Sequence, residues 1–238
     1  MLLGAGRDII VDDSNRSEVT RELTELLYAL THDLGAPLRV IDGFSEALVD
    51  EQQNASSADA LEYLTTIRSA VSRMNAMFDG IRQLHRVSQA PFLPADVDVT
   101  ALAETIVSEL RAADAARDVR VTVERDLVTN ADPALFRIAL TQLLQNAWKF
   151  TARRTGARIT VGREDPVTLF VQDNGAGFDP AAAAGRMFTP FQRFHQASDY
   201  DGLGIGLALV RRIVHRHGGR VRAAGAMQQG TTVSMELP

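Results

Sequence analysis

The sequence contains no cysteine among its 238 residues. This absence excludes disulfide bonds, cysteine-ligated zinc sites and catalysis by a thiol. The chain also has no apolar run long enough to span a bilayer, and residues 1–13 lack the basic start and apolar core of a secretory signal. We therefore expect a cytoplasmic segment that makes no membrane contact.

The sequence has no excess of positive charge either. Its formal net charge is -5, whereas a dedicated nucleic-acid binder usually presents a basic face. We therefore expect no nucleic-acid partner. The hydrophobic content of 45% and the charged content of 23% are ordinary for a globular protein, and the length suits one large domain or two modest ones.

Two long amphipathic helices are predicted between residues 15 and 90. Apolar residues recur there at steps of three and four, and residues 54–59 interrupt the pattern with capping residues. A lone antiparallel hairpin cannot bury such stripes, so we expect two copies of the chain to pair as a four-helix bundle. The first stripe comprises Val19, Leu23, Leu26, Leu27, Leu30, Leu34, Leu38, Ile41, Phe44 and Leu48, and the second comprises Leu61, Leu64, Ile67, Val71, Met74, Phe78, Ile81 and Leu84.

The C-terminal part of the chain alternates between predicted helices and strands. Asp132 and Pro133 are suited to begin a helix, and Gly218 with Gly219 is suited to end one. This order is typical of an α/β two-layer sandwich with segregated helices. The predicted helices span residues 100–116, 133–150 and 205–217, and the predicted strands span residues 119–123, 157–163, 167–172, 220–224 and 231–237.

Domain boundaries follow from these patterns. The helical hairpin takes residues 15–90, a proline-containing linker takes residues 91–98, and the sandwich takes residues 99–238. Residues 1–14 suggest a short strand followed by turn residues, or else a disordered start. The predicted fold class is therefore multidomain, with an α-helical part followed by an α+β part.

Five short motifs follow one another along the chain at domain-scale spacing. They are His32-Asp33-Leu34-Gly35-Ala36-Pro37, Asn146-Ala147-Trp148-Lys149-Phe150, Asp173-Asn174-Gly175-Ala176-Gly177, Phe188-Thr189-Pro190-Phe191-Gln192-Arg193 and Gly202-Leu203-Gly204-Ile205-Gly206-Leu207. In this order they resemble the core of a sensor histidine kinase, and residues 190–221 look most like the kinase module of bacterial phytochromes. The resemblance implies a dimeric helical hairpin followed by an ATP-binding sandwich of the gyrase and histidine kinase type. It also implies that residues 1–14 resemble the end of a PAS-type sensor domain.

His32 is the expected phosphoacceptor. It lies two residues from both Leu30 and Leu34 of the apolar stripe, so it points away from the bundle seam. A neutral imidazole is a competent nucleophile near pH 7. The resemblance implies that Asp33 orients the ring and acts as the base during phosphoryl transfer, and Pro37 is expected to kink the helix just beyond them. A lone His–Asp pair is more often a plain surface feature, but the downstream motifs favour the acceptor.

Asn146 and Lys149 lie three residues apart on one predicted helix, so they share a face. The resemblance implies that Asn146 ligates Mg²⁺ through its side-chain oxygen together with phosphate oxygens, and that Lys149 approaches the phosphates. Phe150 belongs to the same motif and is assigned to the nucleotide site, although a core position is the simpler role for it. No Glu occurs between Asp132 and Phe150, which favours transfer to histidine over ATP hydrolysis of the gyrase type.

Asp173 ends an apolar, strand-like run and enters a glycine-containing turn. A carboxylate at this point is able to accept a hydrogen bond from the exocyclic amine of adenine, and Gly175 and Gly177 let the backbone approach the base. The alternative is an ordinary β-turn, because Asp-Asn-Gly is strong turn chemistry.

Gly202, Gly204 and Gly206 open a predicted helix, and Leu207 follows them. Backbone N–H groups at the start of a helix are able to hold phosphates. The spacing matches neither a Rossmann fingerprint nor a Walker loop. These four residues are therefore assigned to the nucleotide site.

Residues 178–201 resemble a lid over ATP. The resemblance implies that Phe188 and Phe191 dock against the helical domain. It also implies that Arg193 reaches the γ-phosphate and stabilises charge in the transition state. The alternative for the aromatic residues is an ordinary core position.

The predicted function is that of an autophosphorylating, ATP- and Mg²⁺-dependent histidine kinase of a two-component system. The expected partners are a second copy of the chain, the receiver domain of a response regulator, and an upstream sensor domain in the full-length protein. Ala36 stands where relatives with strong phosphatase activity tend to carry Thr or Asn, so weak phosphatase activity is expected. The alternatives are a gyrase-type ATPase and a non-catalytic dimeric phosphotransfer scaffold.

Overall fold

The computed structural model describes residues 34, 36–48, 57–195, 199–200 and 202–238. The predicted acceptor pair, His32 and Asp33, and the N-terminal segment 1–14 lie outside the described residues. Within the described part of the chain, no helix is both long and apolar enough to cross a membrane.

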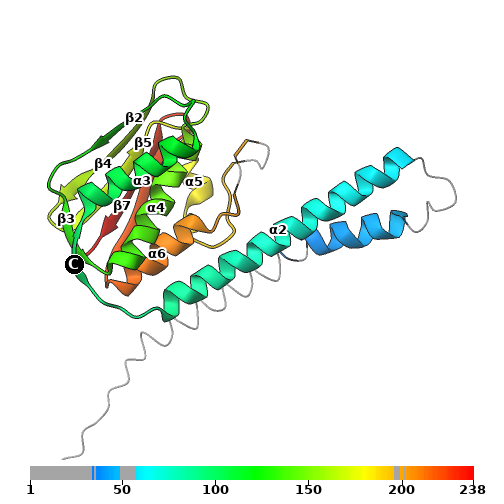
Figure 1. Ribbon diagram of the computed structural model, residues 1–238, viewed down its shortest axis with the longest axis horizontal. Helices are drawn as coiled ribbons and strands as arrows, with labels where there is room; N and C mark the ends of the chain where they lie inside the picture. Colours follow the sequence, from blue (N-terminus) through cyan, green and yellow to red (C-terminus); the bar gives the residue numbers. More distant parts are fainter. Residues whose placement is uncertain (1–33, 35, 49–56, 196–198, 201) are drawn as a thin grey trace, which may run out of the picture.

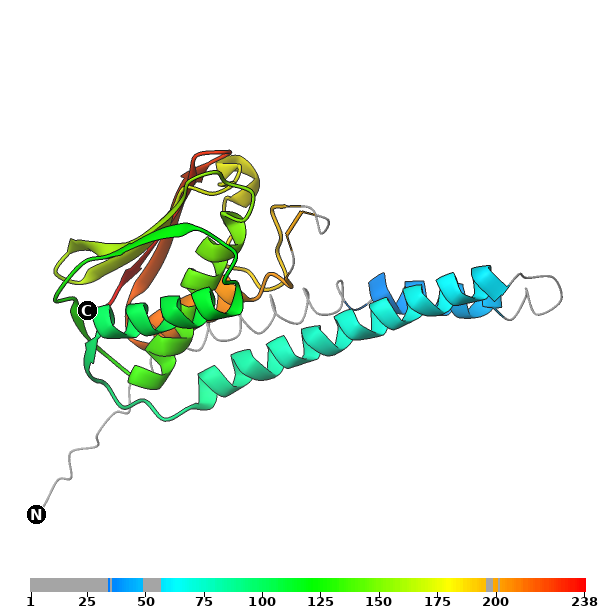
Figure 2. The ribbon, with the colours of Figure 1, turned by 45° about the horizontal axis from the view of Figure 1, so that its top comes forward.

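Two antiparallel helices form the N-terminal part of the molecule (Figures 1 and 2). Residues 36–48 are helical, and the second helix, α2, spans Ser57–Gln89. At a rise of 1.5 Å per residue, α2 is about 50 Å long. The rings of Phe44 and Tyr63 join the two helices, with centroids 5.4 Å apart. The predicted helical hairpin is thus present over the described residues.

A five-stranded sheet with helices on one face forms the C-terminal part (Figures 1 and 2). The strand order is β2-β4-β5-β7-β6, in which β2 and β4 are parallel and the other neighbours are antiparallel. The sheet contains β2 (Val119–Val123), β4 (Ala157–Asp165), β5 (Thr168–Asp173), β6 (Arg220–Ala226) and β7 (Gly230–Glu236). The helices are α3 (Val99–Ala113), α4 (Pro133–Phe150) and α6 (Gly206–Arg216), with a short α5 (Pro180–Ala183) near β6. The predicted two-layer sandwich is confirmed.

The core of the sandwich lies between the sheet and these helices. Side chains of β4 alternate, with Ile159 and Val161 buried, as expected for a strand covered on one face. One face of α4 supplies Phe136, Leu140 and Leu144, which are almost fully inaccessible to solvent. Another side of α4 carries Gln142, Asn146 and Lys149, which line a cavity.

The boundary of the sandwich differs from the sequence prediction. Residues 95–98, which were assigned to the linker, form the strand β1 (Ala95–Asp98) and pair antiparallel with β3 (Val128–Ala131). Val97 of β1 is buried, and the Asp98 side chain accepts a hydrogen bond from the backbone N–H of Ala101 and so caps α3. The prediction of a linker over residues 91–98 was therefore wrong in its second half, and the linker shortens to residues 90–94.

The short linker is held against α6. Arg216 donates hydrogen bonds to the carbonyl oxygens of Val87 and Ala90, and the Arg212 Nε atom donates to the Ser88 hydroxyl at 2.8 Å. These carbonyls belong to the end of α2, where a helix leaves its last acceptors unpaired. Arg216 therefore satisfies acceptors at the end of α2, and both arginines fasten the hairpin to the sandwich.

Candidate active site

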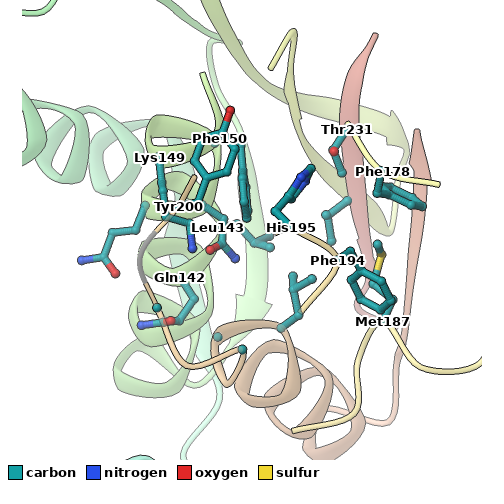
Figure 3. Close-up of a pocket in the computed structure, with 18 of the residues that line it drawn as sticks. Gln142, Leu143, Lys149, Phe150, Phe178, Met187, Phe194, His195, Tyr200 and Thr231 are labelled. Carbon is teal, nitrogen blue, oxygen red and sulfur yellow. The ribbon is translucent and has the colours of Figure 1, made fainter. Parts of the chain in front are cut away.

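A cavity of about 340 Å³ lies between α4, the ends of β5 and β7, and the glycine segment before α6 (Figure 3). It gathers nearly all of the residues that the sequence assigns to a nucleotide site. Gly175 does not line the cavity, but its N–H donates to Asp173 at 2.7 Å. The assigned residues in the cavity wall are Asn146, Lys149, Phe150, Asp173, Gly177, Arg193, Gly202, Gly204, Gly206 and Leu207.

Asn146 faces the start of α6. A Cβ atom added to Gly206 would lie 3.5 Å from Asn146 Nδ2 and only 2.6 Å from Gln142 Oε1. A side chain at position 206 would therefore displace these amides, and the glycine keeps the space open. Asn146 and Gln142 are one helical turn apart on α4, so both reach the same end of the cavity.

The first turn of α6 begins without a side-chain cap. Ile205, at the N-cap position, provides no side-chain hydrogen bond to the helix. The first N–H groups of a helix have no partner within the helix and carry the positive end of its dipole. This end of the cavity is therefore suited to hold phosphate oxygens.

Gly204 must be a glycine for two reasons. Its φ angle is 74°, in the left-handed region. A Cβ atom there would also collide with the carbonyl oxygen of Gln192. At Gly204 the backbone before α6 therefore passes directly against the backbone of Phe191 and Gln192.

Lys149 lies at the same end of the cavity. A Cβ atom at Gly202 would be 3.2 Å from Lys149 Nζ, which also lies 4.4 Å from the centre of the Phe150 ring. The ammonium group therefore lies against the glycine segment that precedes α6. It adds positive charge where the free N–H groups of α6 begin.

Asp173 lies at the other end of the cavity, where β5 ends. The residue is only 8% exposed. Burial raises the pKa of its carboxyl group to about 6, and hydrogen bonds from the backbone N–H groups of Gly175 and Thr231 partly oppose this shift. A buried carboxylate with remaining acceptor capacity is well suited to an amine donor of a ligand.

The β6–β7 turn covers the loop that follows Asp173. Gly177 has a φ angle of 63°, and a Cβ atom there would collide with the carbonyl oxygen of Ala226. Gln228 donates its backbone N–H to the carbonyl oxygen of Ala176 at 2.7 Å. The loop after Asp173 needs a glycine at position 177 to pass under the β6–β7 turn. The same loop also forms part of the cavity wall.

The two lid phenylalanines have different surroundings. Phe191 is buried against Met77 of α2, with Leu203 and Ile205 beside it. Phe188 instead packs against the core of the sandwich. Phe191 thus contacts the helical domain as expected. Phe188 packs on a core that also includes Val87 of α2, and its docking on the helical domain stays a prediction.

Arg193 lines the cavity, and its guanidinium group donates to the carbonyl oxygen of Tyr200 at 2.6 Å. Tyr200 belongs to a cluster of three rings that the sequence analysis missed. The His195 ring centroid lies 5.3 Å from that of Phe150 and 5.2 Å from that of Tyr200, and Phe150 and Tyr200 are 5.1 Å apart. The closeness of His195 and Tyr200 to the Phe188–Arg193 motif was the only signal for them in the sequence.

The described residues contain no group of three or more His, Asp or Glu side chains that would hold a metal ion by themselves. The oxygen of the Asn146 amide is a hard ligand of the kind that Mg²⁺ prefers. A Mg²⁺ ion at Asn146 would therefore need further oxygens from a ligand, and the phosphates of a nucleotide supply such oxygens.

Two family models match the chain. Residues 22–90 match the His Kinase A (phospho-acceptor) domain. Residues 131–238 match the family described as histidine kinase-, DNA gyrase B-, and HSP90-like ATPase. The two matches follow each other in the order of the helical hairpin and the sandwich.

Curated relatives and solved structures agree with these matches. The chain is 28% identical to cyanobacterial phytochrome A of Nostoc sp. over 96% of the chain and 30% of that protein. It is 30% identical to the methanogenesis regulatory histidine kinase FilI of Methanothrix harundinacea over 91% of the chain and 25% of that protein. The chain thus spans less than a third of the length of these relatives. The fold is also that of histidine kinase ThkA in complex with response regulator protein TrrA, with a TM-score of 0.64, 18% identity, and coverage of 95% of this chain and 65% of that one.

Proposed function

The chain is a histidine kinase core, and on that premise we propose that it transfers the γ-phosphoryl group of ATP to His32. One observation carries the proposal. The cavity presents a buried carboxylate at one end, and at the other end an amide, an ammonium group and the free N–H groups of α6. The carboxylate suits the amine of a nucleotide base, and the groups at the other end suit the phosphates.

The base and the phosphates take opposite ends of the cavity. The Asp173 carboxylate accepts a hydrogen bond from the exocyclic amine of adenine, which selects adenine over guanine. The N–H groups at the start of α6 and Lys149 hold the phosphates. Mg²⁺, when bound at Asn146, neutralises charge on the phosphate oxygens.

The transfer step is a direct displacement at phosphorus. An imidazole nitrogen of His32 attacks the γ-phosphorus, the bond from that phosphorus to the bridging oxygen breaks, and ADP leaves. Asp33 holds the other ring nitrogen and so fixes the tautomer. Arg193, which lines the cavity, stabilises the charge that develops on the transferred group.

Two kinds of partner belong to this proposal. Apolar side chains of α2 stay exposed on the described surface, among them Leu61, Leu64 and Phe78 at 66%, 49% and 48%, and a second copy of the chain would cover them. The phosphoryl group then passes from His32 to an aspartate of a response regulator. The likeness of the fold to a kinase found in complex with its response regulator supports this second partner.

Incubation with γ-labelled ATP and Mg²⁺ tests the proposed function. The wild-type chain is expected to take up label that is labile in acid and stable in alkali, whereas His32→Gln and Asn146→Ala are expected to take up none. His85→Gln, at an exposed position of α2, is the matched control and keeps the label. Release of free phosphate without labelling of the chain would instead show a gyrase-type ATPase, and absence of ATP binding would show a non-catalytic scaffold.

A further inference from the structure

We propose that Gly80 of α2 is a positioning residue, whose missing side chain lets Ile205 of the sandwich pack directly against the helical hairpin. This contact holds the phosphate end of the nucleotide cavity against the hairpin. The inference rests on the proposed function, because the contact acts on transfer of the phosphoryl group to His32. It concerns the rate of that transfer and not the affinity for the nucleotide.

Gly80 lies inside a long helix, where alanine would give a more stable helix. A Cβ atom added to Gly80 would lie 2.5 Å from Cδ1 of Ile205 and 3.6 Å from both of its Cγ atoms. Carbon atoms in contact lie about 3.5 to 4 Å apart, so the Cδ1 methyl group takes the space of the missing side chain. Gly80 is therefore buried by the sandwich, and the glycine makes room on α2 for Ile205.

One face of α2 carries the contact with the sandwich, and α6 lies beside it (Figures 1 and 2). Met77 and Val87, one turn before Gly80 and two turns after it, are buried, and Leu84 packs against the core of the sandwich. Phe78, on a different face of the helix, is 48% exposed. Helix α2 thus uses one face for the sandwich and leaves another for a second copy of the chain.

Ile205 connects this face of α2 with the phosphate end of the cavity. It is the N-cap residue of α6, and it lines the cavity. Its side chain also packs against the cluster of Met77 and Phe191, and so does Leu34 of the first helix. Leu34 follows His32 by two positions in the sequence. The start of α6 and the helix that carries the acceptor therefore pack on one cluster.

The contact at Gly80 adds a second attachment between α2 and α6. Arg212 and Arg216 fasten the last turn of α2 to α6. Gly80 lies about 10 Å from Val87 along α2, at a rise of 1.5 Å per residue. One attachment leaves a pivot, whereas two attachments along a helix fix its direction. The contact at Gly80 therefore sets the angle between the hairpin and the sandwich, and with it the direction in which the phosphate end faces.

The test compares Gly80→Ala with Gly43→Ala, a matched control at an exposed helical glycine of the hairpin whose added Cβ atom would meet open space. Labelling by γ-labelled ATP is measured at saturating ATP and Mg²⁺, and ADP affinity is measured by calorimetry. The added methyl group of Gly80→Ala pushes α2 away from Ile205, so its labelling rate is expected to fall about tenfold while its ADP affinity stays at the wild-type value. Gly43→Ala is expected to match the wild type in both.

Ile205→Val provides the rescue, because it removes only the Cδ1 methyl group that the added Cβ atom would meet. The double variant of Gly80→Ala with Ile205→Val is expected to label within about twofold of Ile205→Val alone. A loss that Ile205→Val does not restore, or equal labelling by Gly80→Ala and Gly43→Ala, would overturn the inference and leave the proposed function standing. If the wild-type chain takes up no label, the proposed function fails and the inference fails with it.

A second measurement does not depend on activity. The chain has no cysteine, so the pair Gly80→Cys with Ile205→Cys reports the contact by disulfide formation. The Cγ atoms of Ile205 lie 3.6 Å from a Cβ atom at position 80, which brings a sulfur at position 205 within reach of one at position 80. Mild oxidation is expected to cross-link this pair within one chain and to leave Gly43→Cys with Ile205→Cys open. No cross-link in the first pair, or one that joins two chains, would overturn the inference.

Discussion

The helical hairpin and the sandwich bury their apolar side chains to different extents. In the sandwich, a single chain covers a continuous core, in which Leu144 and Leu209 are fully inaccessible. In the hairpin, Met77 and Val87 are buried where α2 meets the sandwich, but Leu61 and Leu64 are exposed farther along the helix. The part that holds the nucleotide cavity is thus complete within one chain, whereas the part that carries His32 calls for a second copy. Nucleotide binding should therefore need one chain, and phosphorylation should need two.

The largest effect is expected in the core of the sandwich. Leu144→Ala removes a fully buried side chain from α4, and such a change lowers the free energy of unfolding by about 3 to 5 kcal/mol. Val128→Ala, at a position of β3 that is 48% exposed, serves as the control and should lower it by less than about 0.5 kcal/mol. Urea denaturation followed by circular dichroism measures both, and similar losses for the two variants would contradict a core that is complete in one chain.

The double variant Leu64→Glu with Phe78→Glu tests the other side of the comparison. Two carboxylates buried at a helical interface are expected to raise the dissociation constant of the dimer by at least about 100-fold. Sedimentation equilibrium measures this change, and labelling per chain should fall with dimer content while ADP affinity stays at the wild-type value. Glu62→Gln, exposed on the same helix, is the control. A wild-type chain that is monomeric yet fully active would contradict the claim that the hairpin needs a second copy of the chain.

Asp173→Ala is expected to weaken nucleotide binding without affecting the dimer. Loss of a hydrogen bond to a charged group costs about 1.5 to 3 kcal/mol, so the dissociation constant for ADP should rise about 10- to 150-fold. Asp118→Ala, at an exposed position of the sandwich, is expected to leave that constant unchanged. Normal ADP binding by Asp173→Ala would show that the carboxylate does not hold the base.

Much of this arrangement is predictable from the sequence, and the failures have physical causes. The period of apolar residues and the Asp132–Pro133 start define α4 correctly, because those signals are local. Strands β1 and β3 have four residues each and are held by pairing across thirty or more positions of the chain, so no local pattern marks them. Phe188 and Phe191 are equivalent in the motif, and only tertiary packing decides that Phe191 meets α2. The His195 ring cluster was missed because Phe150 is far away in sequence.

The smallest of these effects is a pH dependence of binding at Asp173. The pKa of its carboxyl group is about 6 in the folded protein, against an ordinary value of 3.8. The folded protein therefore gains stability from this group, relative to the unfolded chain, as pH falls from about 6 towards 4. Because the ionised carboxylate accepts the base amine, adenosine affinity should be nearly constant above pH 7 and fall by about tenfold from pH 7 to pH 5. Titration of adenosine followed by NMR measures this, and Asp173→Asn should bind with no such dependence. An adenosine affinity that does not change with pH in the wild type would show that the base does not bind at Asp173.

The most direct test of the account is to locate the phosphate on the wild-type chain. After incubation with ATP and Mg²⁺, the protein is digested at alkaline pH and its peptides are sequenced by mass spectrometry. We predict a single phosphohistidine, in the peptide that contains His32. Phosphate on His85, His195, His215 or His217 instead, or an unmodified chain in a solution where ATP has been hydrolysed, would contradict it.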